Sequence, residues 1–201
     1  MDMKIKLNQV VLVEGKYDKI KLSSLLDATI LTTDGFGIFK EAEKRSLLRR
    51  LAKERGIIVV TDSDGAGRVI RGHIASFLPK EQVVNLYIPK IRGKEARKTA
   101  PSKEGTLGVE GMDADLLRSL FAPYAVDSHR SDFAPVDRWR YFEDGFTGGA
   151  NSSHLRAELA KALDLPDDLS ANALLEAINL LGGLPLYEQA LSRMEPATEE
   201  E

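Results

Sequence analysis

The sequence contains no cysteine in its 201 residues, which excludes a disulfide scaffold and a metal site built from thiolates. No apolar run approaches the roughly 18 residues that a membrane-spanning helix needs. The N-terminus is charged and lacks the hydrophobic core of a signal peptide. We therefore expect a cytoplasmic protein with no membrane partner.

The composition is that of an ordinary globular protein, with 43% hydrophobic and 29% charged residues. The net charge of −3 argues against indiscriminate binding to nucleic acid. Four glutamates lie among the last seven residues, and without them the net charge becomes about +1. Any basic surface on this protein must therefore be local.

Strand-like and helix-like patterns alternate over the first 122 residues. Continuous apolar runs predict buried parallel strands over 9–13, 28–33, 57–60 and 83–88. Apolar residues at helical spacing predict helices over 16–27, 41–55 and 113–121. A further helix after Gly67 is expected to turn Val69, Ile70, Ile74 and Phe77 inward. This alternation predicts an α/β fold with a mainly parallel sheet flanked by helices.

The remainder of the chain has a different pattern and predicts a small all-helical domain. Helices are expected over 153–163, 170–181 and 186–194, with the bundle sealed by Trp139, Tyr141 and Phe142. The predicted organisation is an α/β domain over 1–122, a linker over 123–137, a helical domain over 138–194 and an acidic tail over 195–201.

Three acidic residues stand where predicted strands end. Asp62 and Asp64 follow the third strand, and they point the same way if the backbone is extended. Glu14 ends the first strand, and neighbouring strands lie about 4.8 Å apart. If these two strands are neighbours, the three carboxylates share one edge of the sheet. Such acids can bind Mg²⁺, or Mn²⁺ in its place, hold a phosphodiester and assist an attacking water.

Other residues near these acids are candidates for supporting roles. Gly15, Gly65 and Gly67 allow sharp turns and a close approach of main chain to phosphate oxygens. Asp18 is expected to support either the site or the first turn of its helix. Glu110 either adds a metal ligand or caps the helix that begins near residue 113. Helix capping is also the common role of any one strand-end acid, so the interpretation as a site depends on their joint arrangement.

Two other motifs share part of this pattern. An EF-hand loop that starts at Asp62 would need oxygen ligands at its fifth and twelfth positions, where Ala66 and His73 stand, so it is excluded. A haloacid dehalogenase-like phosphatase would carry the Asp62–Gly65 segment followed by threonine. Ala66 takes that place, and two strands precede a motif that usually opens such domains.

A long basic segment follows the fourth strand, over residues 89–107. Only two glutamates oppose its six cations: Lys90, Arg92, Lys94, Arg97, Lys98 and Lys103. Flexible cationic side chains bind nucleic-acid phosphates without reading sequence. A solvated charged loop is the alternative interpretation, and the segment's position before Glu110 favours a function.

Two stretches resemble the Toprim domain of topoisomerases, primases and small nucleases: VVLVEGKYD at 10–18 and VVTDSDGAG at 59–67. The resemblance implies Glu14 as an acid/base or metal-side glutamate, with Asp62 and Asp64 as Mg²⁺ ligands. TTDGFG at 32–37, which contains Gly35, resembles the glycine turn after the family's second strand.

Within Toprim proteins, the chain most resembles the ribonuclease M5 family. The likeness is carried by PSKEGTLGVEG at 101–111, FTGGANS at 146–152 and ALDLP at 162–166. It implies an endoribonuclease that matures double-stranded precursor 5S ribosomal RNA, with a 5S rRNA-binding ribosomal protein as partner. The alternatives are a non-catalytic Toprim nucleic-acid-binding module and a paralogous nuclease with another RNA or DNA substrate. A primase fragment would carry zinc-binding cysteines, which are absent.

Overall fold

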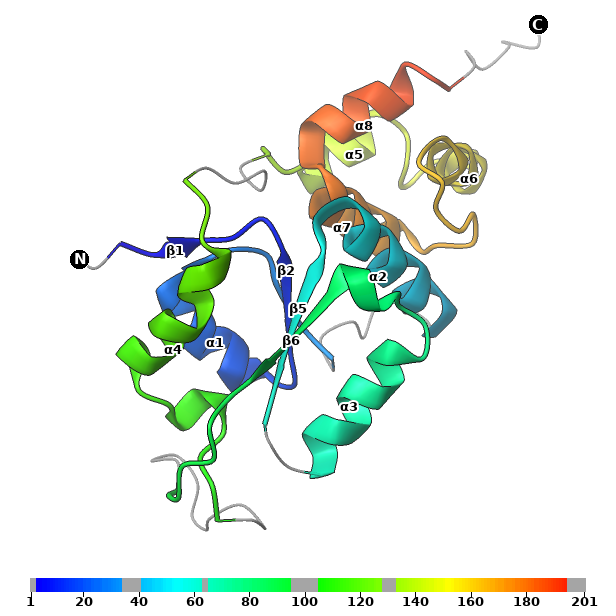
Figure 1. Cartoon of the computed structure of the whole chain (residues 1–201). Coiled ribbons are helices and arrows are strands. Elements are labelled where there is room, and N and C mark those ends of the chain that lie inside the picture. The colour runs from blue at the N-terminus through cyan, green and yellow to red at the C-terminus, as the bar shows by residue number, and fades with distance from the viewer. Residues whose placement is uncertain (1–2, 34–40, 63–64, 95–104, 128–132, 195–201) are drawn as a thin grey trace, which may run out of the picture. The chain divides into compact units, whose positions relative to one another are not determined.

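The computed structural model describes residues 3–33, 41–62, 65–94, 105–127 and 133–194 (Figure 1). The chain forms two compact units, one of Met1–Gly37 with Leu48–Ser131 and one of Ile38–Leu47 with Asp132–Glu201. The domain boundaries expected at residues 122 and 138 stay a prediction. Across the described ranges, no helix has both the length and the apolar character needed to cross a bilayer.

The first unit is built on a four-stranded sheet in the order β4-β2-β5-β6, with every neighbouring pair parallel. Its strands are β2 (Val10–Val13), β4 (Ile30–Thr32), β5 (Ile57–Thr61) and β6 (Val83–Tyr87). All residues of β2 and β5 are buried, as their continuous apolar runs predicted. Because neighbouring strands run parallel, their carboxyl ends meet at one edge of the sheet.

A second sheet was not anticipated. β1 (Ile5–Lys6) pairs with β3 (Leu26–Asp27) in parallel, and the amide of Leu7 continues the pairing by donating to the Asp27 carbonyl at 3.1 Å. The helix expected over 16–27 therefore ends earlier. Strands of two residues are too short to leave an alternating pattern in the sequence.

Helices cover both faces of the four-stranded sheet (Figure 1). α1 (Lys16–Leu25) and α4 (Ala114–Phe121) pack on one face, where Leu22 and Phe121 join a core cluster with Val11 and Ile58. α3 (Gly65–Ala75) lies on the other face. α2 (Glu41–Arg55) has the predicted bounds, and its part within the first unit buries Leu48 and Leu51. Short 3-10 turns occur at η1 (Lys80–Gln82), η2 (Val109–Gly111) and η3 (Ala122–Tyr124).

The inward face of α3 differs from the predicted one at Val69, which is 72% exposed. Ile74 is buried as expected, and Gly67 is buried as well. A Cβ atom at Gly67 would lie 2.1 Å from the carbonyl oxygen of Asp62, so the helix begins in direct contact with the end of β5. This close approach turns Gly67 toward the sheet, and Val69 falls on the solvent side.

The second unit contains the three expected helices, α6 (Ser152–Ala162), α7 (Ala171–Leu181) and α8 (Gly183–Leu191). It also contains the short helix α5 (Arg138–Glu143), which the sequence did not predict. Tyr141 packs inside it against Phe146, with ring centroids 5.1 Å apart, and both rings approach Tyr187. Trp139 and Phe142 do not seal the bundle, because they are 67% and 50% exposed. α5 has six residues and turns only Tyr141 inward.

The structure thus confirms the predicted fold class, a parallel α/β sheet flanked by helices with a small all-helical C-terminal part. Its consequence for function lies at the carboxyl edge of the four-stranded sheet, where β2 and β5 end side by side.

Candidate functional site

Glu14 follows β2 directly and stands at the carboxyl edge of the sheet. β2 and β5 are hydrogen-bonded neighbours, with Val13 paired to Val60, so Glu14 is level with the last residue of β5. The Thr33 hydroxyl donates to the Glu14 carbonyl at 3.0 Å, and the Thr33 amide donates to the Val13 carbonyl at 2.8 Å. These bonds fix the main chain that carries the glutamate. The two strands are therefore neighbours, which is the condition under which their terminal acids share one edge.

Asp62 follows β5 at the same edge and lies against the segment before η2. The Val109 amide donates to Asp62 Oδ1 at 3.2 Å. A Cβ atom at Gly108 would lie 2.6 Å from Asp62 Oδ2, closer than real Cβ contacts allow. The carboxylate therefore lies on a patch of bare main chain that only glycine provides at residue 108. Its Oδ1 thus accepts from a segment other than the helix that follows it.

Asp18 lies close to two other carboxylates, those of Asp62 and Glu110. The Gly15 amide donates to Asp18 Oδ2 at 3.1 Å, so Asp18 does support the first turn of α1. Burial raises the pKa of Asp18 to about 6, and the negative charges of Asp62 and Glu110 add to this shift. Hydrogen bonds from the main chain of Gly15 and of Glu110 oppose it. Asp18, Asp62 and Glu110 thus come together from three separate segments.

Glu110 lies in η2 and does not cap the following helix. The N-cap of α4 is Asp113, whose side chain accepts from the amides of Asp115 at 2.9 Å and Leu116 at 3.2 Å. The capping interpretation of Glu110 is therefore wrong. The electrostatic effect of Glu110 on Asp18 places it beside the acidic site instead.

The donor set suits a hard divalent cation in kind. Asp64, like Gly35, lies outside the described residues, and within those residues no three Asp, Glu or His side chains are grouped closely enough to hold a metal ion. The carboxylates of Asp18, Asp62 and Glu110 nevertheless concentrate negative charge beside a sheet edge. Oxygen donors with an excess of negative charge match the preference of Mg²⁺. The metal assignment of Glu14, Asp62, Asp64 and Glu110 stays a prediction.

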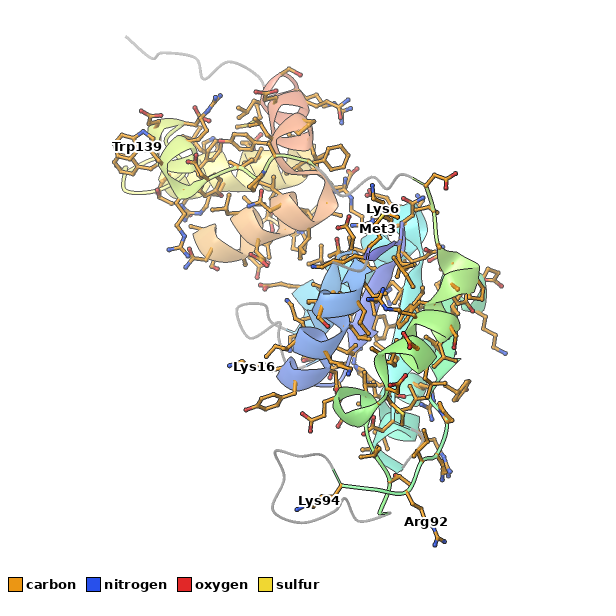
Figure 2. The ribbon with its side chains drawn as sticks, turned by 90° about the vertical axis from the view of Figure 1, so that its left-hand side faces the viewer. Met3, Lys6, Lys16, Arg92, Lys94 and Trp139 are labelled. Atoms are coloured by element: carbon orange, nitrogen blue, oxygen red, sulfur yellow. The ribbon has the colours of Figure 1, made fainter. Side chains whose placement is uncertain are left out.

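The base of the basic segment is ordered, where the sequence indicated only a loop. Arg92 and Thr106 form an antiparallel bridge, flanked by bonds from the Gly93 amide to the Gly105 carbonyl at 3.1 Å and from the Leu107 amide to the Ile91 carbonyl at 2.8 Å. We call residues 91–93 and 105–107 the basic ribbon. Exposed Lys90, Arg92 and Lys94 lie on and beside it, and Figure 2 shows the latter two at one end of this unit. Arg97, Lys98 and Lys103 lie outside the described residues.

Sequence reasoning missed Gly108, Val109 and Arg71. Arg71 of α3 donates to the Thr61 hydroxyl and to the Asp62 carbonyl. A main-chain amide that binds a carboxylate has no sequence signature, so Val109 could not be found this way. The glycines at 108 and 111, which flank Glu110, were the one available signal for a close main-chain approach.

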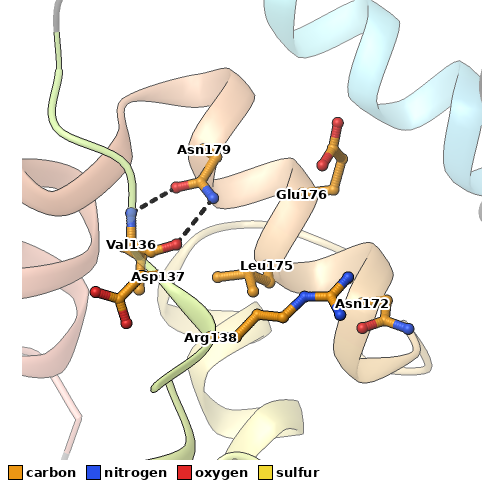
Figure 3. Close-up of a pocket in the computed structure, with 7 residues that line it drawn as sticks. All are labelled: Val136, Asp137, Arg138, Asn172, Leu175, Glu176 and Asn179. Atoms are coloured by element: carbon orange, nitrogen blue, oxygen red, sulfur yellow. Dashed lines mark hydrogen bonds between the residues drawn. The ribbon is translucent and has the colours of Figure 1, made fainter. Parts of the chain in front are cut away.

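The second unit has a pocket of about 280 Å³ between the start of α5 and one face of α7 (Figure 3). Asn179 closes one side by accepting from the Val136 amide at 2.8 Å and donating to the Val136 carbonyl at 3.1 Å. Arg138 and Glu176 also line it, so its charge is mixed. None of the predicted site residues contributes to this pocket.

Comparison with known proteins agrees with the resemblance found in the sequence. No protein-family model matches the chain. The chain is 29% identical over 195 residues to the ribonuclease M5 of Streptococcus pneumoniae, covering 96% of this chain and 100% of that protein. It is 30% identical over 161 residues to the ribonuclease M5 of Clostridium botulinum, covering 79% and 81%, and 28% identical over 165 residues to that of Fusobacterium nucleatum, covering 81% and 82%. With this identity over most of both chains, the protein belongs to the ribonuclease M5 family.

Proposed function

We propose that this protein is a Mg²⁺-dependent endoribonuclease that cleaves structured precursor ribosomal RNA, in the maturation of 5S rRNA. The proposal depends above all on one observation. The parallel strands β2 and β5 end together at Glu14 and Asp62, and the Val109 amide holds the Asp62 carboxylate at this edge. Membership of the ribonuclease M5 family supports RNA as the substrate class.

The proposed roles follow from the positions of the acids. Asp62 and Asp64 would hold Mg²⁺, and Glu14 would either move a proton or serve as a further ligand. When bound, Mg²⁺ offsets the charge that develops on the phosphate and lowers the pKa of a coordinated water. The Val109 amide keeps one oxygen of Asp62 engaged, so the carboxylate has a fixed orientation. Glu110 and Asp18 add negative charge that a cation offsets.

The basic ribbon is the surface that we expect to bind RNA. It continues from β6, whose carboxyl end lies at the same edge as Asp62, and its second strand leads within two residues to Val109. Lys90, Arg92 and Lys94 are exposed, which suits contact with phosphates. Duplex RNA is recognised mainly by its shape and backbone, so these cations favour a double-stranded region without reading its sequence.

A 5S rRNA-binding ribosomal protein is the partner that we expect to present the substrate, and the cytoplasm is the expected location. The exposed Trp139 and Phe142 of the second unit can make such contacts, with ring centroids 5.9 Å apart. Aromatic residues are enriched at the centres of protein interfaces.

The test is cleavage of a precursor 5S rRNA transcript by the full chain, with Mg²⁺ and with EDTA. We expect specific cleavage only with Mg²⁺, and a loss of at least about 100-fold in rate for Asp62→Asn and Glu14→Gln, since both keep the side-chain volume but remove the charge. Glu81→Gln is the matched control, because Glu81 is exposed and precedes β6 at the other end of the strand. It is expected to cleave at the wild-type rate.

Three outcomes would contradict the proposal in different ways. Tight RNA binding without Mg²⁺-dependent cleavage indicates a non-catalytic binding module. Cleavage of other RNA or DNA substrates, with 5S precursor left intact, indicates a paralogous nuclease. Cleavage that survives Asp62→Asn unchanged shows that the catalytic site lies elsewhere.

A further inference from the structure

The main chain of Asp62 is held by a residue from α3. Arg71 donates through Nη1 to the hydroxyl of Thr61 and to the carbonyl oxygen of Asp62, the latter at 3.3 Å. Thr61 is 1% exposed, so its hydroxyl has a fixed place at the end of β5. Gly67 packs against the same Asp62 carbonyl. Thr61 and Asp62 are therefore both joined to α3 by a partly buried guanidinium.

Arg71 is itself restrained by an aromatic ring. Its Cζ atom lies 4.7 Å from the centroid of the Tyr87 ring, in a cation–π arrangement. Tyr87 is the last residue of β6 and pairs in register with Thr61. Tyr87 and Thr61 thus come from adjacent strands and fix the guanidinium from two sides, which removes most of its conformational freedom.

Hydrogen bonds consequently hold both the main-chain carbonyl and the side-chain carboxylate of Asp62. The Arg71 guanidinium binds its carbonyl from the α3 side, and the Val109 amide binds its carboxylate from the η2 side. A metal-binding carboxylate gains affinity when its surroundings fix its orientation before the ion arrives. Arg71 would make this contribution indirectly, because its contacts are with main chain, a hydroxyl and a ring.

We propose that Arg71 is a positioning residue of the metal site, which acts through Thr61 and the main chain of Asp62 and is kept in place by Tyr87. This inference rests on the proposed function of Asp62 as a metal ligand. It assigns Arg71 to metal affinity and not to RNA binding. The two roles differ in what they predict, since a phosphate contact would change RNA affinity and its salt dependence.

The experiment measures Mn²⁺ binding to the full chain by the electron paramagnetic resonance of free Mn²⁺, beside RNA binding in EDTA. Arg71→Gln is expected to weaken Mn²⁺ binding about tenfold and to leave RNA affinity within about twofold of wild type. Arg71→Lys is expected to restore part of the affinity, since an ammonium group can bond one of the two oxygens but not both in the same geometry. Arg68→Gln, an exposed arginine of the same helix, is the control and is expected to bind Mn²⁺ as wild type does.

If Arg71→Gln binds Mn²⁺ within about twofold of the wild-type affinity, this inference is overturned and the proposed function is not. A selective loss of RNA affinity would have the same meaning. Absence of Mn²⁺ binding in the wild-type chain would overturn the proposed function and the inference with it.

Thermal unfolding is measured for each variant. If Arg71→Gln does not fold, Tyr87→Leu replaces it, because Tyr87 is 57% exposed and its loss frees the guanidinium without deleting it. A roughly threefold weakening of Mn²⁺ binding in Tyr87→Leu supports the inference, and unchanged binding contradicts it.

Discussion

The Val109 amide donates a hydrogen bond to Oδ1 of Asp62 across 3.2 Å, although 47 positions separate the two residues. This bond connects the carboxyl edge of the sheet to the segment that returns from the basic ribbon. It leaves the second oxygen, Oδ2, directed at Gly108. The orientation of the central acid of the candidate site therefore depends on the main chain of a distant segment.

Gly108→Ala is expected to reduce cleavage strongly, because the new Cβ atom would lie 2.6 Å from Oδ2 and 3.0 Å from Oδ1 of Asp62. The carboxylate has to move, and we expect a loss of at least about tenfold in rate with a cost of about 1–2 kcal/mol in unfolding free energy. Gly72→Ala is the control, since a Cβ atom there meets nothing within 4 Å and lies inside α3. It should stabilise the protein by about 0.5–1 kcal/mol. Equal cleavage by Gly108→Ala and wild type would contradict the expected contact.

Asp18→Asn is expected to raise the unfolding free energy by about 1–2 kcal/mol near neutral pH in EDTA. The folded-state pKa of Asp18, about 6, is above its usual value of 3.8, so the folded state binds more protons between these values. The contribution of Asp18 to the unfolding free energy is therefore fully present below about pH 4, and it is lost as pH rises through 6. The asparagine removes the charge and can still accept from the Gly15 amide, while its single oxygen replaces a carboxylate that also accepts from the Glu110 main chain.

The measurement for Asp18 is denaturant unfolding of wild type and variant across that pH range, with exposed Asp127→Asn as the control. The stability that Asp18→Asn gains over wild type should disappear at low pH, because Asp18 is then protonated in both the folded and the unfolded wild-type chain. A pH-independent difference would show that charge is not its cause.

Removal of the ribbon cations is expected to weaken RNA binding without changing cleavage at saturating RNA. The triple variant Lys90→Ala, Arg92→Ala, Lys94→Ala should lower the slope of log affinity against log salt by up to about 0.7–0.9 for each phosphate that the variant no longer neutralises. Lys53→Ala with Lys80→Ala is the control pair, because both lysines are exposed and lie apart from the ribbon. An unchanged salt slope in the triple variant would favour a solvated charged segment.

Removal of the hydroxyl from two buried tyrosines in the second unit is expected to change the unfolding free energy differently. Tyr187 donates to Asp144 Oδ2 at 2.8 Å, so Tyr187→Phe should cost about 1 kcal/mol or more. The Tyr141 hydroxyl is buried and has no hydrogen-bond partner among the described residues, so Tyr141→Phe should be neutral or stabilising. Thermal unfolding of both variants checks this contrast, and the same sign for both would contradict it.

The elements that the sequence predicted well have strong local signals. The β2 and β5 runs, the bounds of α2 and the all-helical C-terminal part follow from apolar patterns that packing did not override. Val69, Trp139 and Phe142 were assigned to the interior wrongly, because a periodic pattern does not say which of several apolar residues a short helix turns inward. The ribbon differs from the loop that the sequence predicts, because its pairing joins residues on either side of a long basic stretch.

The sequence by itself determined which acids stand at strand ends, because each follows an apolar run directly along the chain. Only the tertiary structure decided that β2 and β5 are neighbours, that Glu110 lies beside Asp18 and Asp62, and that Val109 and Arg71 both hold Asp62. The physical reason is that main-chain amides and close approaches have no side-chain signature. They become visible only when folding brings distant segments within hydrogen-bond distance of one another.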